Sequence, residues 1–203
     1  MDIVEQNHVI SVTEEQRDLM TELINIGVGR AASSLSQLLE TRIELTVPGI
    51  EFCKKFPGSF QERCKDATIV LQNFTGPIAG ESGLMFDRPS GLKLTSVLSG
   101  LDQTAEDFDF EMEGILLEIG NVVLNGVLGS ISNALNTQLQ YTVPELYVSG
   151  LVESQLLGDN ASDTTLMLAH VSFSVAESDI EGSVIMAFNL GSVETIVSTI
   201  LMD

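Results

Sequence analysis

Basic residues are missing from the second half of this chain. All nine lysines and arginines of the 203-residue sequence lie at or before Lys93, where 13 acidic residues leave a net charge of −4. Residues 94–203 carry 16 acidic side chains and no lysine or arginine, which accounts for most of the formal charge of −20. Because so negative a surface repels phosphate backbones and anionic lipids, we expect neither nucleic acid nor a membrane surface as a partner.

Cysteines are scarce, and long apolar runs and a secretory signal are not evident. Cys53 and Cys64 are the only cysteines; they could bridge in an oxidising compartment, but without a secretory signal two reduced thiols are favoured over a disulfide. The N-terminal segment lacks a basic region followed by an apolar stretch, so we expect no secretory signal. No uninterrupted apolar run approaches the roughly 18–20 residues of a membrane span. The sequence therefore predicts a cytoplasmic protein without membrane insertion.

Four basic residues gather beside the cysteines, namely Lys54, Lys55, Arg63 and Lys65. Such a cluster is typical of a solvated loop or turn, and a docking patch is the alternative interpretation. The two histidines are far apart in the sequence and predict no zinc site. We therefore expect no metal ligand set in this chain.

One unusual spacing occurs twice. In each half, two residues separate a glutamate from an asparagine, and 22 residues separate that asparagine from a proline. A shift of 96 positions relates the two sets, which are Glu22, Asn25 and Pro48 in the first half and Glu118, Asn121 and Pro144 in the second. The repeat predicts a duplicated unit.

The two halves also share a predicted order of elements: two helical stretches, several strands and a closing helix. A T-x-x-Q capping box at Thr13 begins the first helix. The predicted helices are 13–26, 30–39, 91–98, 110–124, 128–135 and 192–201, with glycines at 27 and 29 weakening the first pair. The predicted strands are 43–47, 50–52, 67–74, 81–86, 139–143, 146–151, 165–173 and 182–188. This order predicts an α+β fold.

The hydrophobic content, 44% of the residues, is enough for a substantial core. The linker between the halves is short and acidic, which argues against two freely hinged domains. We therefore predict one domain over residues 1–203, made of half-repeats at about 13–99 and 109–203.

Each glutamate and asparagine stand three apart on a predicted helix, so their side chains point together. A carboxamide both donates and accepts hydrogen bonds, and it can orient a water molecule without being a strong base, as the glutamine of GTPases does. A carboxylate offers an anion to a lysine of a partner. One such pair alone is also typical of the solvated edge of an amphipathic helix. Its duplication favours an enzyme that completes the active site of another protein.

These residues resemble the motif of the CheC/CheX/FliY family of bacterial and archaeal chemotaxis phosphatases. That motif is Asp or Ser, three residues, Glu, two residues, Asn, 22 residues and Pro. The first half matches it in full, with Asp18 in the leading position. The second half matches except at Gly114. The length, the duplication and the lack of an added motor-binding domain are most similar to the CheC members of the family.

The resemblance implies a pseudo-twofold sheet with the two long motif helices on one outer face, and an activity that dephosphorylates the response regulator CheY. The asparagine of each pair, Asn25 or Asn121, would position water in line with the aspartyl phosphate. The glutamate, Glu22 or Glu118, would pair with the regulator's active-site lysine. Mg²⁺ is expected on the regulator, and no cofactor is expected on this chain.

The other motif positions are expected to support the pairs. Pro48 and Pro144 need no catalytic role and would set the turn after the first strand of each half. Asp18 lies one turn before Glu22 and adds a third polar group to the first site. Gly114 leaves the second site without that group, which either weakens it or removes a non-essential contact.

Two alternatives remain open. The chain could be a binding module of the same family that holds CheY, or the receptor deamidase CheD, without much hydrolysis. It could also be a purely structural duplicated domain. The glutamate and asparagine present in both halves favour catalysis over both alternatives.

Overall fold

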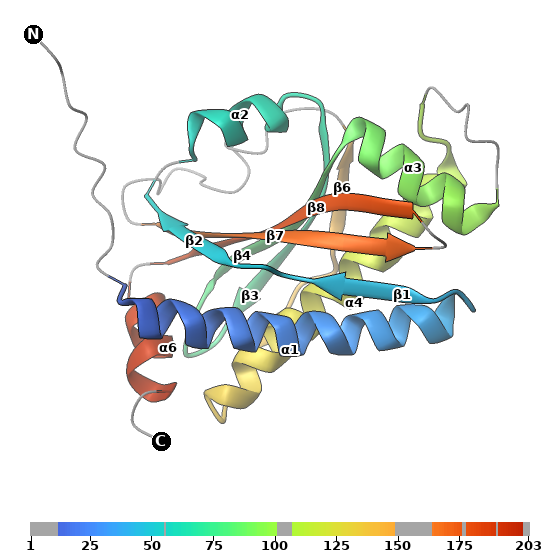
Figure 1. Ribbon diagram of the computed structural model, residues 1–203. Coiled ribbons are helices and arrows are strands. Elements are labelled where there is room, and N and C mark those ends of the chain that lie inside the picture. The colour runs from blue at the N-terminus through green and yellow to red at the C-terminus, as the bar shows by residue number, and fades with distance from the viewer. Residues whose placement is uncertain are drawn as a thin grey trace, which may run out of the picture.

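The computed structural model describes residues 12–54, 56–100, 107–148, 164–175, 178–189 and 191–200. Its helices are α1 (Glu14–Leu38), α2 (Gly58–Cys64), α3 (Arg88–Ser99), α4 (Phe110–Ala134) and α6 (Ser192–Ile200). Its strands are β1 (Ile43–Thr46), β2 (Ile50–Cys53), β3 (Ala67–Thr75), β4 (Gly80–Asp87), β5 (Gln140–Tyr141), β6 (Glu145–Val148), β7 (Thr165–Val175) and β8 (Ser178–Phe188). The predicted α+β class is confirmed (Figure 1).

Strands from both halves of the chain combine in one antiparallel sheet. Within the described residues the order is β1-β7-β8-β4-β3-β5, while β2 also pairs with β7 and β6 with β3. β1 of the first half therefore pairs with β7 of the second, and β5 of the second half pairs with β3 of the first. Each half thus supplies edge strands to the other, as expected of a duplicated unit that completes one core.

α1 begins at the predicted capping box. The Gln16 N–H donates to the Thr13 hydroxyl (3.2 Å), and the Thr13 N–H donates to the Gln16 side chain (2.8 Å). The helix then continues unbroken to Leu38, so the predicted division around Gly27 and Gly29 is wrong. A helical glycine costs only about 1 kcal/mol relative to alanine. Gly27 is buried against α4, and this packing outweighs its low helix propensity.

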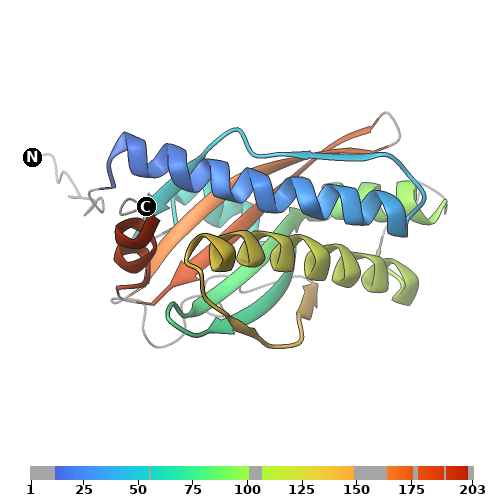
Figure 2. The same cartoon turned by 90° about the horizontal axis from the view of Figure 1, so that it is seen from below.

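α4 is also one helix, and the predicted gap between residues 124 and 128 does not occur. It runs antiparallel to α1, because the Ser130 hydroxyl donates to the Leu23 carbonyl (2.7 Å) while Gly126 faces Gly27. A Cβ on Gly27 would lie 2.5 Å from the Gly126 carbonyl oxygen, and a Cβ on Gly126 would lie 2.6 Å from the Gly27 carbonyl oxygen. The two backbones therefore touch, and the helices lie side by side on one face of the sheet (Figure 2).

α4 is long and apolar enough to cross a membrane by length and composition alone. An 18-residue window of this 25-residue helix has a mean hydropathy of 1.6, and half of that window is buried inside the fold. The search for uninterrupted apolar runs missed it, because Glu118 and Asn121 interrupt the run. Its buried side chains join the core beneath α1, and they include Leu116, Val123 and Leu124. A buried core helix accounts for this composition.

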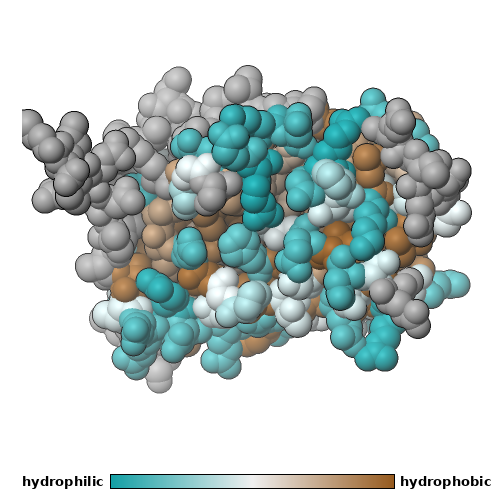
Figure 3. Space-filling model, turned by 45° about the horizontal axis from the view of Figure 1, so that its top comes forward, coloured by the Kyte–Doolittle hydropathy of each residue, from teal (hydrophilic) through white to brown (hydrophobic). Residues whose placement is uncertain are grey.

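The opposite face of the sheet has a second apolar cluster, in which Phe56 and Phe60 stack at 5.1 Å and pack with side chains of β3, β4, β7 and β8. The loop predicted at the basic cluster is in part the helix α2, where the Arg63 guanidinium lies 6.0 Å from the Phe60 ring centre. Lys54 donates to a β7 hydroxyl (3.1 Å), and Lys55 lies outside the described residues. Hydrophilic and hydrophobic residues are intermingled on this side (Figure 3).

Both cysteines are free thiols, in agreement with the predicted reduced state. Burial, with a smaller contribution from the Glu51 carboxylate, raises the pKa of the Cys53 thiol to about 11. Because the thiolate is the reactive form of cysteine, Cys53 is a poor nucleophile at neutral pH.

Glu81 is a half-buried carboxyl on β4, flanked by Asn73 of β3 and Ala187 of β8. Its Oε2 is buried and has no hydrogen-bond partner in the part of the chain that the structure describes. Burial raises the pKa of this carboxyl above its ordinary value. A carboxyl whose pKa rises on folding disfavours the folded state once the pH exceeds the unfolded pKa.

Replacing Gly27 with alanine is expected to destabilise the protein by about 1–3 kcal/mol, since the new methyl group would overlap the α4 backbone. Gly29→Ala is the matched control on the same helix. Nothing lies within 4 Å of a Cβ at Gly29, so alanine there should stabilise the protein by about 0.5–1 kcal/mol. Urea denaturation measures both changes. Equal losses for the two variants would contradict the backbone contact.

Glu81→Gln is expected to stabilise the protein at neutral pH, because the amide removes a charge that burial disfavours. The wild-type carboxyl is protonated in acid, so the stabilisation is smallest there. It grows as the pH rises from the ordinary carboxyl pKa through the raised one. Thermal denaturation of both proteins over a pH series tests this, and a difference that shrinks with rising pH would exclude it.

Candidate functional site

The predicted pairs lie on the outer surfaces of the two long helices. Glu22 on α1 and Glu118 on α4 are exposed, while Asn25 and Asn121 are half-buried. Since α1 and α4 cover the same face of the sheet, both pairs open on the same side of the molecule (Figure 2).

The two pairs form separate sites. Gly27 and Gly126 face each other on antiparallel helices, with Glu22 five residues before the first and Glu118 eight residues before the second. At 1.5 Å per residue, the two glutamates are roughly 20 Å apart along the helix axes. One lysine of a partner therefore cannot contact both carboxylates.

In the first site, the Asn25 carboxamide is bound to the backbone. Its Nδ2 donates to the Val47 carbonyl (2.9 Å) and to the Thr21 carbonyl (3.1 Å), and its Oδ1 accepts from the Val47 N–H (3.0 Å). Both Nδ2 hydrogens and one oxygen lone pair are therefore used inside the fold. Only one acceptor position of Asn25 is left for a ligand.

This contact gives a physical reason for the distance between the asparagine and the proline. Val47 lies between β1, which ends at Thr46, and β2, which begins at Ile50, so its N–H and C=O fall outside the pairing with β7. Asn25 satisfies both groups. Pro48 has no N–H of its own and keeps Val47 extended. The asparagine and the proline thus belong to one structural unit.

In the second half, the same Thr-Val-Pro sequence makes different contacts. The Thr142 N–H donates to the Asn73 carbonyl (3.0 Å), and the Asn73 N–H donates to the Thr142 hydroxyl (3.0 Å). The Gln72 side chain donates to the Thr142 carbonyl (2.9 Å). β3 therefore holds this segment away from the helix. As a result Val143 is 82% exposed, whereas its counterpart Val47 is 3% exposed.

Asn121 is held by a neighbouring side chain. The Asn125 Nδ2, one helical turn later, donates to the Asn121 Oδ1 (2.8 Å). Across the described ranges of the chain, no hydrogen bond joins Asn121 to Val143, and none is donated by the Asn121 Nδ2. Glu118 has no hydrogen-bond or ion-pair partner among the same residues. Asn121 therefore keeps two donor hydrogens and an acceptor lone pair for a ligand.

The remaining predicted positions lie beside these contacts. Asp18 is exposed one turn before Glu22, and Pro48 is exposed after the Asn25 contact. Pro144 is half-buried between β5 and β6. Gly114 is exposed and has nothing within 4 Å of a Cβ position, so the second site lacks an aspartate for which there is room.

Sequence reasoning missed two contributions to these sites. It did not identify Asn125 as the donor to Asn121, although residues four apart on a helix are neighbours. It gave the Val47 backbone no role. The only signal for that role was the constant 22-residue distance, which marks a contact without identifying its atoms.

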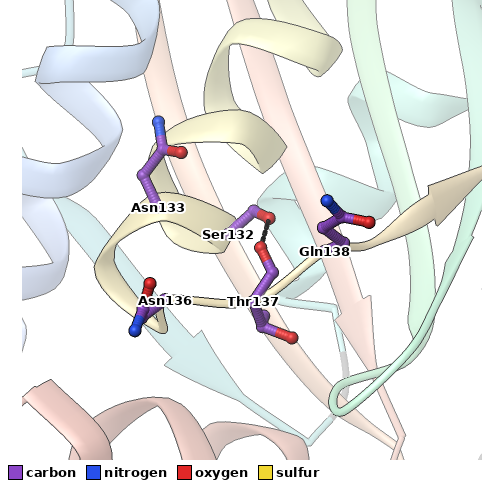
Figure 4. Close-up of a pocket in the computed structure, with 5 residues that line it drawn as sticks. All are labelled: Ser132, Asn133, Asn136, Thr137 and Gln138. Carbon is purple, nitrogen blue, oxygen red and sulfur yellow. Dashed lines mark hydrogen bonds between the residues drawn. The ribbon is translucent and has the colours of Figure 1, made fainter.

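A polar pocket of about 380 Å³ lies elsewhere, where α4 ends and leads into β5 (Figure 4). It is lined by Ser132, Asn133, Asn136, Thr137 and Gln138. The Ser132 hydroxyl donates to the Thr137 carbonyl (2.7 Å), which closes the helix end. None of the predicted site residues lines this pocket, and its lining has no acid, base or cation. Over the described part of the chain, no three His, Cys, Asp or Glu side chains gather as metal ligands.

Comparison with known proteins gives the same family as the motif. A model described as the CheC-like family matches residues 15–51, the segment that contains Glu22, Asn25 and Pro48. The CheY-P phosphatase CheC of Bacillus subtilis (strain 168) is 27% identical over 170 residues, which cover 74% of this chain and 78% of that relative. The family resemblance stated from the motif is confirmed.

Two further matches extend along nearly the whole chain. The flagellar motor switch phosphatase FliY of B. subtilis (strain 168) is 22% identical over 208 residues, covering 99% of this chain and 53% of the relative. The chain thus spans about half the length of that protein. The crystal structure of Thermotoga maritima FliY superposes with a TM-score of 0.76 at 17% identity, covering 95% of this chain and 99% of that one. This likeness establishes a shared fold.

The two asparagines are expected to differ in their contribution to stability. Asn25→Ala leaves the Val47 N–H and C=O without partners and should cost about 1–3 kcal/mol. Asn121→Ala removes only a bond to one half-buried side chain and should cost less than about 1 kcal/mol. Chemical denaturation of the two variants measures the difference. Similar losses would show that the Asn25 contact does not hold the β1–β2 connection in place.

Proposed function

Because this chain belongs to the CheC-like family, we propose that it hydrolyses the phospho-aspartate of a CheY-type response regulator. One observation carries the proposal: the exposed α4 surface presents Glu118 and Asn121, and this carboxamide retains hydrogen-bonding capacity for a ligand. The relative named as a CheY-P phosphatase supports the choice of substrate. On this proposal the chain is a hydrolase that acts on a partner protein in the cytoplasm.

The reaction breaks the bond between phosphorus and the aspartyl oxygen of the regulator. Water attacks phosphorus in line, the aspartate leaves as a carboxylate, and the protons of the water end on the released phosphate and in solvent. Asn121 holds the water by accepting one of its hydrogens at Oδ1, which turns a water lone pair toward phosphorus. No strong base is needed, because the step relies on the position of the water and on charge stabilisation.

The partner supplies the positive charge for this step. Residues 94–203 contain no lysine or arginine, so the second site does not neutralise a phosphoryl group from its own half. Mg²⁺ held by the regulator would supply that charge, and no cofactor of this chain would be needed. Glu118 pairs with the active-site lysine of the regulator and so aligns the two proteins.

The second site is the more active of the two on this proposal. Each asparagine keeps one Oδ1 lone pair for a water, but the hydrogens of the Asn25 Nδ2 are both committed to carbonyls, so only Asn121 can also donate to the phosphoryl group while it holds the water. Asn25 can accept a water hydrogen only in the orientation that Val47 imposes. The missing aspartate at Gly114 therefore matters less than the state of the carboxamide.

The first site supports a second candidate function, which is binding without much hydrolysis. Asp18 and Glu22 are exposed on α1 and make an acidic surface, while Asn25 is engaged in the fold. Such a surface can hold the lysine of a response regulator without positioning water. CheD is the other partner that a non-catalytic site of this kind could take.

Asn121→Ala is expected to lower the accelerated rate of phosphate release from phosphorylated CheY by roughly 10²-fold, because the water loses its alignment. Asn25→Ala should reduce the rate by much less. Phosphate release is measured at a temperature at which both variants are folded, with the spontaneous decay of the regulator subtracted. Full activity in the double variant would rule out water positioning by either asparagine.

A binding measurement separates catalysis from the second candidate function. If the wild-type chain binds the phosphorylated regulator without accelerating phosphate loss, the binding module is correct and the phosphatase proposal is wrong. If Asn25→Ala removes most of the activity while Asn121→Ala does not, the ranking of the sites is reversed.

A further inference from the structure

We propose that Asn125 is a positioning residue that fixes the orientation of the Asn121 carboxamide for hydrolysis. The inference rests on the proposed function and assigns a role that the motif does not contain. Its basis is the hydrogen bond from the Asn125 Nδ2 to the Asn121 Oδ1, at 2.8 Å.

The direction of this hydrogen bond decides which atom of Asn121 meets a ligand. The terminal torsion of an asparagine side chain is broad and roughly two-fold, so an isolated carboxamide exchanges its oxygen and nitrogen readily. Because the Asn125 nitrogen donates, the Asn121 oxygen must lie on the Asn125 side, and its nitrogen on the other. The remaining lone pair of the Asn121 Oδ1 then has one fixed place for accepting a water hydrogen.

Stability does not explain an asparagine at position 125. The Oδ1 of Asn125 is buried and has no hydrogen-bond partner among the described residues. A buried polar atom without a partner opposes folding, and asparagine is also a mediocre helix former. The retained carboxamide is therefore explained by its action on Asn121.

The first half shows what happens without this residue. The 96-position shift that relates the two motifs aligns Asn125 with Gly29, which has no side chain to donate. There the carboxamide of Asn25 is oriented by the Val47 backbone instead, and both of its hydrogens are used. In the second half, orientation by Asn125 takes only one lone pair of Asn121. This arrangement orients the carboxamide while leaving it able to bind a ligand.

The test uses the full chain and a phosphorylated CheY-type regulator. Asn125→Ala is expected to lower kcat for phosphate release on the order of 10-fold, with KM for the regulator nearly unchanged. Its thermal midpoint should stay the same or rise, because an unpaired buried oxygen is removed. Asn133→Ala, an exposed asparagine on the same helix, is the control and should change neither constant.

Asn125→Asp should make kcat depend on pH in a way that a merely structural role of Asn125 would not. The ionised aspartate cannot donate, so the Asn121 nitrogen turns toward it and the water loses its acceptor. Protonation of the aspartate restores a donor, and kcat of this variant, relative to wild type, should therefore recover as the pH falls.

The outcomes separate this inference from the function on which it rests. If wild type accelerates phosphate release and Asn121→Ala abolishes it, but Asn125→Ala retains wild-type kcat, the positioning role is wrong and the phosphatase survives. If kcat and the thermal midpoint of Asn125→Ala fall together and Asn125→Asp shows no recovery in acid, Asn125 is structural. If wild type gives no acceleration at all, the proposed function itself fails.

Discussion

The contact between the α1 and α4 backbones at Gly27 and Gly126 is the constraint on which the rest of the structure depends. It brings two 25-residue helices together on one face of the sheet and fixes their antiparallel order. Because the glutamate–asparagine pairs occupy equivalent places on antiparallel helices, they are turned to opposite ends of the helix pair. The same contact explains why low helix propensity at these glycines does not break the helices: close packing outweighs a penalty of about 1 kcal/mol.

One motif has two different structural states in this chain. In the first half, Asn25 completes the hydrogen bonding of a gap between two edge strands, and Val47 is buried as a result. In the second half, β3 holds the corresponding strand segment through Thr142, so Asn121 has no backbone gap to fill. The edge strands decide this difference. The Asn25 carboxamide is constrained because the fold uses its hydrogen bonds. The Asn121 carboxamide makes no such bonds to the backbone, so it keeps hydrogen-bonding groups for a ligand.

The sequence was sufficient for the repeat, the α+β class, most elements and the capping box at Thr13, because these follow from periodicity and local hydrogen bonding. It was not sufficient for the continuity of α1 and α4, since the packing partner of Gly27 lies 99 positions away. It also missed α2, a short helix that carries the charged side chains of Glu62 and Arg63 and buries Phe60. The orientation of each asparagine depends on backbone atoms and on edge-strand pairing, which residue identities do not reveal.

The absence of positive charge in the second half limits what this site can act on. A phosphatase that binds its own metal or uses its own arginines attracts many phosphorylated molecules, because phosphate itself is the main ligand. Here the second half of the chain contributes acidic side chains and no lysine or arginine, so on the proposed function it does little to attract a free phosphate. On the proposed function, this favours a phosphoryl group whose charge is already balanced by a metal and a lysine of the partner. On the proposed function, the specificity of the enzyme therefore follows from what its own site lacks, since the substrate must bring the cations.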